Sequence, residues 1–291
     1  MTRTGAPASA AGLVVVGLAC QEAGASLAVL LFPQMGPLGM VMLRLVFSAL
    51  VLLLIARPSF RGHRSSAWRA AVQLGTALAV MNACFYLALE KLSLGVAVTI
   101  EVLGPLVLSI VASRRASAWA WAGLAFAGVL ALGAGGWGDI DPVGVLFALG
   151  AGACWAWYIL SSARVGAEFR KLDGLALAMV VGAAISLPFG IVNAGESLLR
   201  IDLVALGAAV ALLSSTIPYA LELVALRRLT AAAFSILMAL APATAALAGF
   251  LLLGQHLTVW EMGGIVLVIA ASMGAIRAGG RRADDIAEPI G

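Results

Sequence analysis

The sequence has few of the residues on which metal sites and disulfide scaffolds depend. It contains only two histidines and three cysteines in 291 residues. No cysteine or carboxylate lies near His63 or His256 at ligand spacing, so we expect no structural metal. Cys20, Cys84 and Cys154 are odd in number and fall in apolar stretches, which argues against a disulfide framework.

Sequence motifs of several enzyme classes are also missing. There is no H-E-x-x-H, no G-x-S-x-G, and no glycine-rich phosphate loop followed by Lys-Ser or Lys-Thr. No basic patch is interleaved with aromatic residues, which makes nucleic acid an unexpected partner. We therefore do not expect an enzyme, and we expect no cofactor.

What the sequence does have is apolar residues in long runs. Hydrophobic residues make up 63% of the chain, charged residues only 11%, and the mean hydropathy is +1.07. This composition predicts an integral membrane protein in contact with a lipid bilayer, with an all-α fold. Stretches long enough to cross the hydrocarbon core can be placed ten times. The predicted spans are 11–32, 37–55, 69–89, 94–113, 117–134, 143–161, 175–192, 203–226, 230–253 and 259–277.

The arginines and lysines predict how these spans are oriented. Connections on the cytoplasmic side of a membrane protein retain positive charge. With the N-terminus inside, fifteen of the eighteen basic residues fall in inner segments, Lys91 and Arg200 fall in outer connections, and Arg44 lies within a span. We therefore expect both termini in the cytoplasm.

An internal repeat divides the chain into two halves. Leu89–Ser93 is echoed by Leu226–Thr230, and the same offset of 137 carries Pro105 onto Pro242. Five spans in each half would insert the second half upside down, as in many secondary transporters. A duplication kept only for packing is the alternative. The predicted segments are a cytoplasmic N-terminus (1–10), two five-helix repeats (11–134 and 143–277) and a disordered cytoplasmic tail (278–291).

The two matched prolines are predicted to interrupt their helices. Proline has no backbone N–H, so the carbonyls four residues earlier, those of Glu101 and Met238, lose their usual donor. Along a hydrated cavity these carbonyls could accept hydrogen bonds from a substrate. The alternative is that each proline only kinks a helix.

Ionisable side chains inside the spans are the main candidates for a functional site. A charge costs roughly 2.5 to 3.5 kcal/mol at the bilayer centre, so such residues usually face water or a partner. Arg44 and Glu101 are predicted at about the same depth, roughly 10 to 12 Å below the outer surface, where they could pair and gate the cavity. Alternatively, Arg44 could extend to the outer headgroups.

Gln21 and Glu22 lie near the middle of the first span, about 15 Å from either surface. A neutral Glu22 bonded to a neighbouring group is the structural interpretation. A proton or substrate site is the functional one, and we favour it because an amide beside a carboxyl would be costly on a lipid face.

Further residues are candidates for the cavity lining or for hinges. Glu222 could form an inner gate, although an interfacial ion pair with the basic connection that follows it is the more ordinary explanation. Buried packing would explain the aromatic residues equally well. The candidates are Asn82, Tyr86, Trp155, Tyr158, Pro218, Tyr219 and Glu222, together with Pro105 and Pro242.

Several stretches of the chain resemble the bacterial threonine/homoserine exporters of the drug/metabolite transporter superfamily, with EamA-type repeats. They are Gly24–Ala28, Leu43–Leu45, Gly104–Leu106, Ser113–Arg115, Ala148–Ser161, Pro218–Glu222 and Ala270–Gly274. The resemblance implies ten helices in two inverted halves, an inner-membrane location, and efflux of small amino acids in exchange for protons. It departs at Ala241, where these exporters commonly have a glutamate before the ninth-span proline.

Our leading hypothesis is therefore a proton-coupled exporter of small amino acids. The substrate ammonium would lie near Glu101 or Glu22, and its carboxylate near Arg44 or a helix break. A transporter of the same fold with another cargo, or one working in the uptake direction, is the alternative. A membrane enzyme is the least favoured.

Overall fold

The fold is known from a computed structural model, which describes residues 5–113, 116–133, 141–169, 172–218, 221, 225 and 237–287. All regular structure in these ranges is helical, in agreement with the predicted all-α class. The elements are α1 (Gly5–Met35), α2 (Pro37–Ala56), α3 (Ser65–Leu89), α4 (Leu94–Glu101), α5 (Leu103–Ser113), α6 (Ala116–Gly133), α7 (Pro142–Glu168), α8 (Asp173–Ala194), the 3-10 turn η1 (Gly195–Leu199), α9 (Ile201–Ala211), the π-helical turn η2 (Leu212–Thr216), α12 (Ala241–Leu253) and α13 (Val259–Ala287).

Five of these helices are long and apolar enough to cross a membrane, judged by length and composition: α1, α2, α3, α7 and α8. Shorter apolar helices lie at 94–108, 119–132, 201–216, 241–253 and 259–274. Every predicted span thus overlaps a helix. The total number of crossings remains a prediction.

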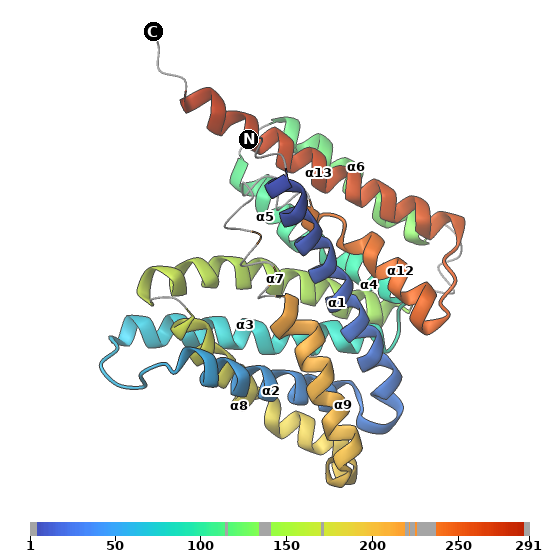
Figure 1. The fold of residues 1–291 in the computed structure, drawn as a ribbon. Helices are drawn as coiled ribbons and strands as arrows, with labels where there is room; N and C mark the ends of the chain where they lie inside the picture. The colour runs from blue at the N-terminus through green and yellow to red at the C-terminus, as the bar shows by residue number, and fades with distance from the viewer. Residues whose placement is uncertain are drawn as a thin grey trace.

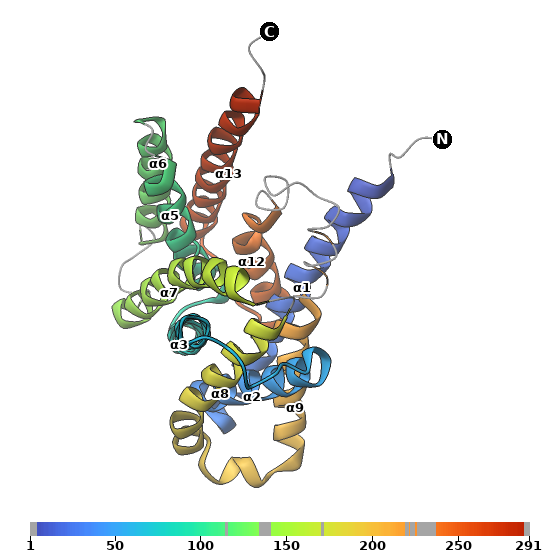
Figure 2. The same cartoon turned by 90° about the vertical axis from the view of Figure 1, so that its left-hand side faces the viewer.

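The helices of the two halves pack against each other along most of their length. Helix α3 lies along α7, α2 along α8, α6 along α13, and α4 along α12, while α1 contacts α9, η2 and α12. Figures 1 and 2 show α5, α6 and α13 on one side of the molecule, α2, α8 and α9 on the other, and α3 and α7 between them. Each of these close pairs joins one half of the sequence to the other.

Small residues allow the closest of these contacts. At the crossing of α6 and α13, a Cβ added to Gly264 would lie 2.6 Å from the carbonyl oxygen of Gly128. At the crossing of α4 and α7, a Cβ on Gly152 would lie 2.6 Å from the carbonyl oxygen of Glu101. Glycine at such positions lets two helix backbones approach directly, as is common in membrane helix pairs.

Two predicted spans are interrupted. Span 94–113 breaks at Val102 into α4 and α5, and span 203–226 changes from α to π geometry at Leu212–Thr216. The first break follows from Pro105, which occupies the first turn of α5, where a missing N–H is tolerated. Helix α12 begins in the same way, with Pro242 in its first turn.

The predicted tail overlaps the last helix. Helix α13 continues to Ala287, and the disorder of 278–291 remains a prediction. Residues 288–291 lie outside the described part of the chain.

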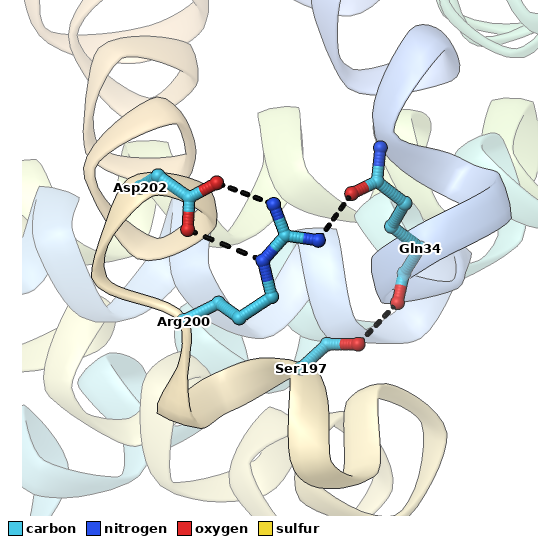
Figure 3. A network of polar contacts seen from close by, with 4 residues as sticks. All are labelled: Gln34, Ser197, Arg200 and Asp202. Carbon is cyan, nitrogen blue, oxygen red and sulfur yellow. Dashed lines mark hydrogen bonds and ion pairs between the residues drawn. The ribbon is translucent and has the colours of Figure 1, made fainter.

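The two basic residues predicted on the outer side are both paired with carboxylates. Lys91 Nζ lies 2.9 Å from Asp141 Oδ2, joining the α3–α4 connection to the start of α7. Arg200 pairs with Asp202 and also donates to the side chain of Gln34 at the end of α1 (Figure 3). The α1–α2 connection and η1, from different halves, are thereby held together at one end of the molecule.

Candidate functional site

A cavity of about 130 Å³ lies where α1, α2, α3, α4, α7 and α12 meet. It is lined by Gln21, Glu22, Ala25, Arg44, Met81, Asn82, Phe85, Val98, Glu101, Trp155, Tyr158, Met238 and Ala241. An apolar cavity of about 150 Å³ is known to bind benzene, so this volume suits a small metabolite and not a drug-sized compound. Seven of the predicted site residues share this wall although they come from five different helices.

Two carboxylates face the cavity from different elements. Glu22 comes from the middle of α1 and is 2% exposed; Glu101 is the last residue of α4 and is 9% exposed. The end of α4 at Glu101 follows from the helix break before Pro105. Two acidic groups buried this deeply are costly unless a positive group, a proton or a ligand accompanies them.

Arg44 supplies a positive group to the same wall. It is buried in α2, and its Nε donates to Ser215 Oγ (3.1 Å), its Nη2 to the Ser214 carbonyl (3.0 Å) and its Nη1 to the Tyr86 hydroxyl (3.4 Å). The guanidinium is therefore held inside the helix bundle and does not reach toward the headgroups, which was the alternative. Its pairing with Glu101 remains a prediction.

Polar and aromatic side chains complete the wall. Gln21 stands beside Glu22 on α1, and Asn82 of α3 donates to the Leu78 carbonyl of its own helix (2.8 Å). Trp155 and Tyr158 come from α7, which crosses α4 at the close Gly152 contact. A cavity with three ionisable groups, two amides and aromatic rings can bind a small zwitterion, with opposite charges available for its two ends.

Comparisons with known proteins show the family of the chain. The model of the EamA-like transporter family matches residues 142–277. The threonine/homoserine exporter RhtA of Escherichia coli K12 is 39% identical over 266 residues, which cover 90% of each chain, and its counterpart in Salmonella typhimurium LT2 is 38% identical over the same share. The chain belongs to the EamA-like transporter family. It is therefore a membrane transporter and not an enzyme.

The likeness to solved structures supports the fold of this EamA-like transporter. One crystal structure aligns over 93% of this chain and 98% of the chain in that structure, with a TM-score of 0.55 and 20% sequence identity. At that identity the likeness speaks for the helical arrangement alone.

Other predicted site residues lie elsewhere in this EamA-like chain. Tyr86 is fully buried and contacts Arg44 behind the cavity wall. Pro105, Pro218 and Pro242 are absent from the lining, although Met238 and Ala241 beside Pro242 are part of it. Tyr219 and Glu222 lie outside the described residues.

The Glu101 carbonyl, which Pro105 leaves without its usual donor, does not have the surroundings that we expected. The Glu101 carbonyl lies against the α7 backbone at Gly152, where no side chain intervenes. The helix crossing covers this oxygen, and weak Cα–H contacts can partly satisfy it there. In this family member Glu101 lines the cavity, and its carbonyl lies at the crossing with α7.

Sequence reasoning missed two groups of residues. The apolar lining residues Ala25, Phe85 and Val98 look like any other residues of an apolar span, so no sequence signal could have found them. Ser214 and Ser215, which bind Arg44, had a signal in Pro218, because Ser214 stands four residues before that proline.

Proposed function

We propose that this transporter exports small zwitterionic amino acids of the threonine and homoserine class. The observation that carries the proposal is the cavity in which the buried residues Glu22, Arg44 and Glu101 converge from three helices. Its volume suits such a molecule. The relatives named as threonine/homoserine exporters match nearly the whole chain, which supports the same cargo.

In this proposal the substrate is bound by charge at both of its ends. The ammonium lies near Glu101 or Glu22, and the carboxylate near Arg44. With both carboxylates ionised and Arg44 positive, the three groups carry a net charge of −1, so a buried site without substrate favours uptake of a proton. Proton entry and substrate exit then compete for the same carboxylates, which is the basis of antiport.

A repeat of two related halves is supported by the way the halves pack, and its inverted orientation follows from an odd number of spans in each half. If a two-fold axis relates the two halves, rotation about it places each helix of the first half on its counterpart in the second. The counterparts are α1 and α7, α2 and α8, α3 and α9 with η2, α4 and α12, and α6 and α13. The pairs α2/α8, α4/α12 and α6/α13 would be carried onto themselves, and α3/α7 onto the pair of α1 with α9 and η2. All of these pairs are close contacts, as a two-fold axis through the cavity requires.

Alternating access follows from that arrangement. The two halves would tilt against each other about the cavity and expose it to one side at a time. We place the protein in the bacterial inner membrane with both termini in the cytoplasm, because the excess of basic residues falls on that side.

A second candidate is transport of a different small metabolite through the same cavity. Ala241 favours it, because this residue lines the cavity at the position where the exporters of the resemblance commonly have a glutamate. A wall with one carboxylate fewer changes the charge that the cargo must carry.

The test is transport by the purified protein in liposomes. Vesicles loaded with labelled L-threonine, L-homoserine, L-leucine or L-lysine are diluted into buffers with and without an imposed proton gradient. We expect efflux of the first two above that of empty vesicles, faster when protons can move in the opposite direction. Efflux of none of the four would refute the proposed cargo class, and efflux of leucine or lysine alone would favour the second candidate.

A further inference from the structure

The segment η2, which follows α9 and contacts Arg44, has an unusual backbone. Residues Leu212–Thr216 form a π-helical turn, in which Ile217 N–H donates to the Leu212 carbonyl. Turns of this kind are rare and disfavoured, and they are found most often at functional sites. The Ser214 hydroxyl donates back to the Val210 carbonyl at 2.6 Å, which ties the start of the turn to the preceding helix.

Pro218 explains why this segment can accept a guanidinium. In an α-helix the Ser214 carbonyl would accept from the N–H of residue 218, but proline has none. The Arg44 Nη2 group takes the place of that donor at 3.0 Å, while Nε donates to the neighbouring Ser215 hydroxyl at 3.1 Å. Two adjacent serines thus offer two acceptors to one guanidinium edge.

Close packing against α1 holds Ser214 and Ser215, the two residues that accept hydrogen bonds from Arg44, in place. A Cβ added to Gly24 of α1 would lie 2.8 Å from the Ser214 nitrogen and 2.9 Å from its Cβ, so the two backbones touch. Ser214 and Ser215 are 1% and 3% exposed. Gly24 lies two residues from Glu22 on α1. The contact between Gly24 and Ser214 therefore fixes the position of Arg44 relative to the helix that carries Glu22.

We propose that Ser215, together with the Ser214 carbonyl freed by Pro218, positions Arg44 so that its guanidinium can bind the carboxylate of the transported amino acid. Ser215 is a positioning residue in this scheme and does not itself touch the substrate. The inference rests on the proposed function, because it assigns the carboxylate end of a zwitterionic cargo to Arg44.

The first experiment measures KM and maximal rate for L-threonine and L-homoserine in proteoliposomes. We expect Ser215→Ala to raise KM about tenfold with a smaller change in maximal rate, since one charge-assisted hydrogen bond to Arg44 is lost. Ser215→Thr keeps the hydroxyl and should stay within about twofold of wild type. Pro218→Ala restores a competing N–H and should raise KM in the same direction as Ser215→Ala.

Ser48→Ala is the matched control. Ser48 lies one helical turn from Arg44 on α2, is buried, and has no hydrogen-bond partner among the described residues. Its loss should leave KM unchanged. If Ser48→Ala and Ser215→Ala raise KM equally, or if Ser215→Ala leaves KM at the wild-type value, the positioning role is wrong.

A second readout does not depend on transport. Hydrogen exchange of the Arg44 Nε–H is followed by NMR on the 15N-arginine-labelled full chain, with the resonance assigned by its absence in Arg44→Lys. We expect exchange about tenfold faster in Ser215→Ala and unchanged in Ser215→Thr. Unchanged exchange in Ser215→Ala would overturn the inference even if wild type transports threonine. Faster exchange without any transport would instead refute the proposed cargo and leave the contact intact.

Discussion

Arg44 and Tyr86 form a buried contact between α2 and α3 behind the cavity wall. The guanidinium carbon lies 5.7 Å from the centre of the tyrosine ring, and Nη1 donates to the hydroxyl at 3.4 Å. The ring therefore provides both packing and a partner for the positive charge. Of these two contributions the packing is the larger, because the hydrogen bond is long.

Tyr86→Phe should cost about 1 kcal/mol of unfolding free energy, since it removes one hydrogen bond and keeps the ring. Tyr86→Ala should cost about 3 to 5 kcal/mol, because it leaves a cavity in the core. Denaturant unfolding in detergent measures both. A phenylalanine variant as unstable as the alanine variant would mean that the hydroxyl, and not the ring, supports Arg44.

The crossing of α4 and α7 should not tolerate a methyl group. Gly152→Ala would place a Cβ against the Glu101 carbonyl. This oxygen belongs to a helix backbone and cannot move aside as the end of a flexible side chain could. We expect a clear drop in thermal stability and loss of transport. Gly166→Ala on the same helix meets no atom within 4 Å and should be neutral or stabilising, by roughly 0.5 to 1 kcal/mol. Equal effects of the two variants would contradict the described crossing.

Asp141 has two separable roles at the start of α7. Its Oδ1 accepts from the N–H groups of Val143 and Gly144, and its Oδ2 pairs with Lys91. Asp141→Asn should keep the helix cap and lose the ion pair, whereas Asp141→Ala loses both and should melt at a lower temperature. Identical melting temperatures for the two variants would mean that the cap contributes nothing.

The Asp141 carboxylate should also make the stability of the protein depend on pH in acid. The hydrogen bond from Lys91, followed by that from Val143, lowers the pKa of the Asp141 carboxyl below its ordinary value of 3.8. A lowered pKa means that the ionised form stabilises the fold above about pH 4 and that this contribution is lost as the pH falls through the lowered value. Melting curves between pH 5 and pH 3 should fall more steeply for wild type than for Asp141→Asn; parallel curves would contradict the assignment.

The predicted orientation can be tested with single cysteines in a version that lacks Cys20, Cys84 and Cys154. A cysteine at Lys91 should react in intact cells with a thiol reagent that cannot cross the inner membrane, and one at Arg164 should react only after the membrane is opened. The two residues lie at opposite ends of the α3–α7 pair: Lys91 pairs with Asp141 where α3 ends and α7 begins, and Arg164 near the end of α7 donates to Gln73 of α3. The reverse pattern of labelling would place the termini outside.

Much of the fold could be predicted because the length of an apolar stretch and the spacing of prolines can be read from short segments of the sequence. The cavity charges could be predicted as well, since Glu22, Arg44 and Glu101 stand out against apolar neighbours whatever they contact. The breaks near Pro105 and Pro242 followed from a missing N–H, although the break after Glu101 came earlier than the proline itself.

What could not be predicted depends on contacts between distant segments. The two serine partners of Arg44 lie about 170 positions further along the chain, and the packing of α1 and α2 against η2 brings them to Arg44. The covering of the Glu101 carbonyl depends on a glycine of another helix, Gly152. The apolar lining from Ala25, Phe85 and Val98 has no local pattern that separates it from lipid-facing residues.

Glu101→Gln tests whether a buried carboxylate couples proton entry to substrate exit. Threonine efflux from proteoliposomes is measured under a proton gradient, and exchange of threonine for threonine is measured without one. The control is Glu90→Gln, which neutralises an exposed carboxylate at the end of α3. We expect Glu101→Gln to retain exchange and to lose the acceleration by the gradient, with the control unaffected. Full gradient-driven efflux by Glu101→Gln would mean that Glu101 does not couple proton entry to substrate exit.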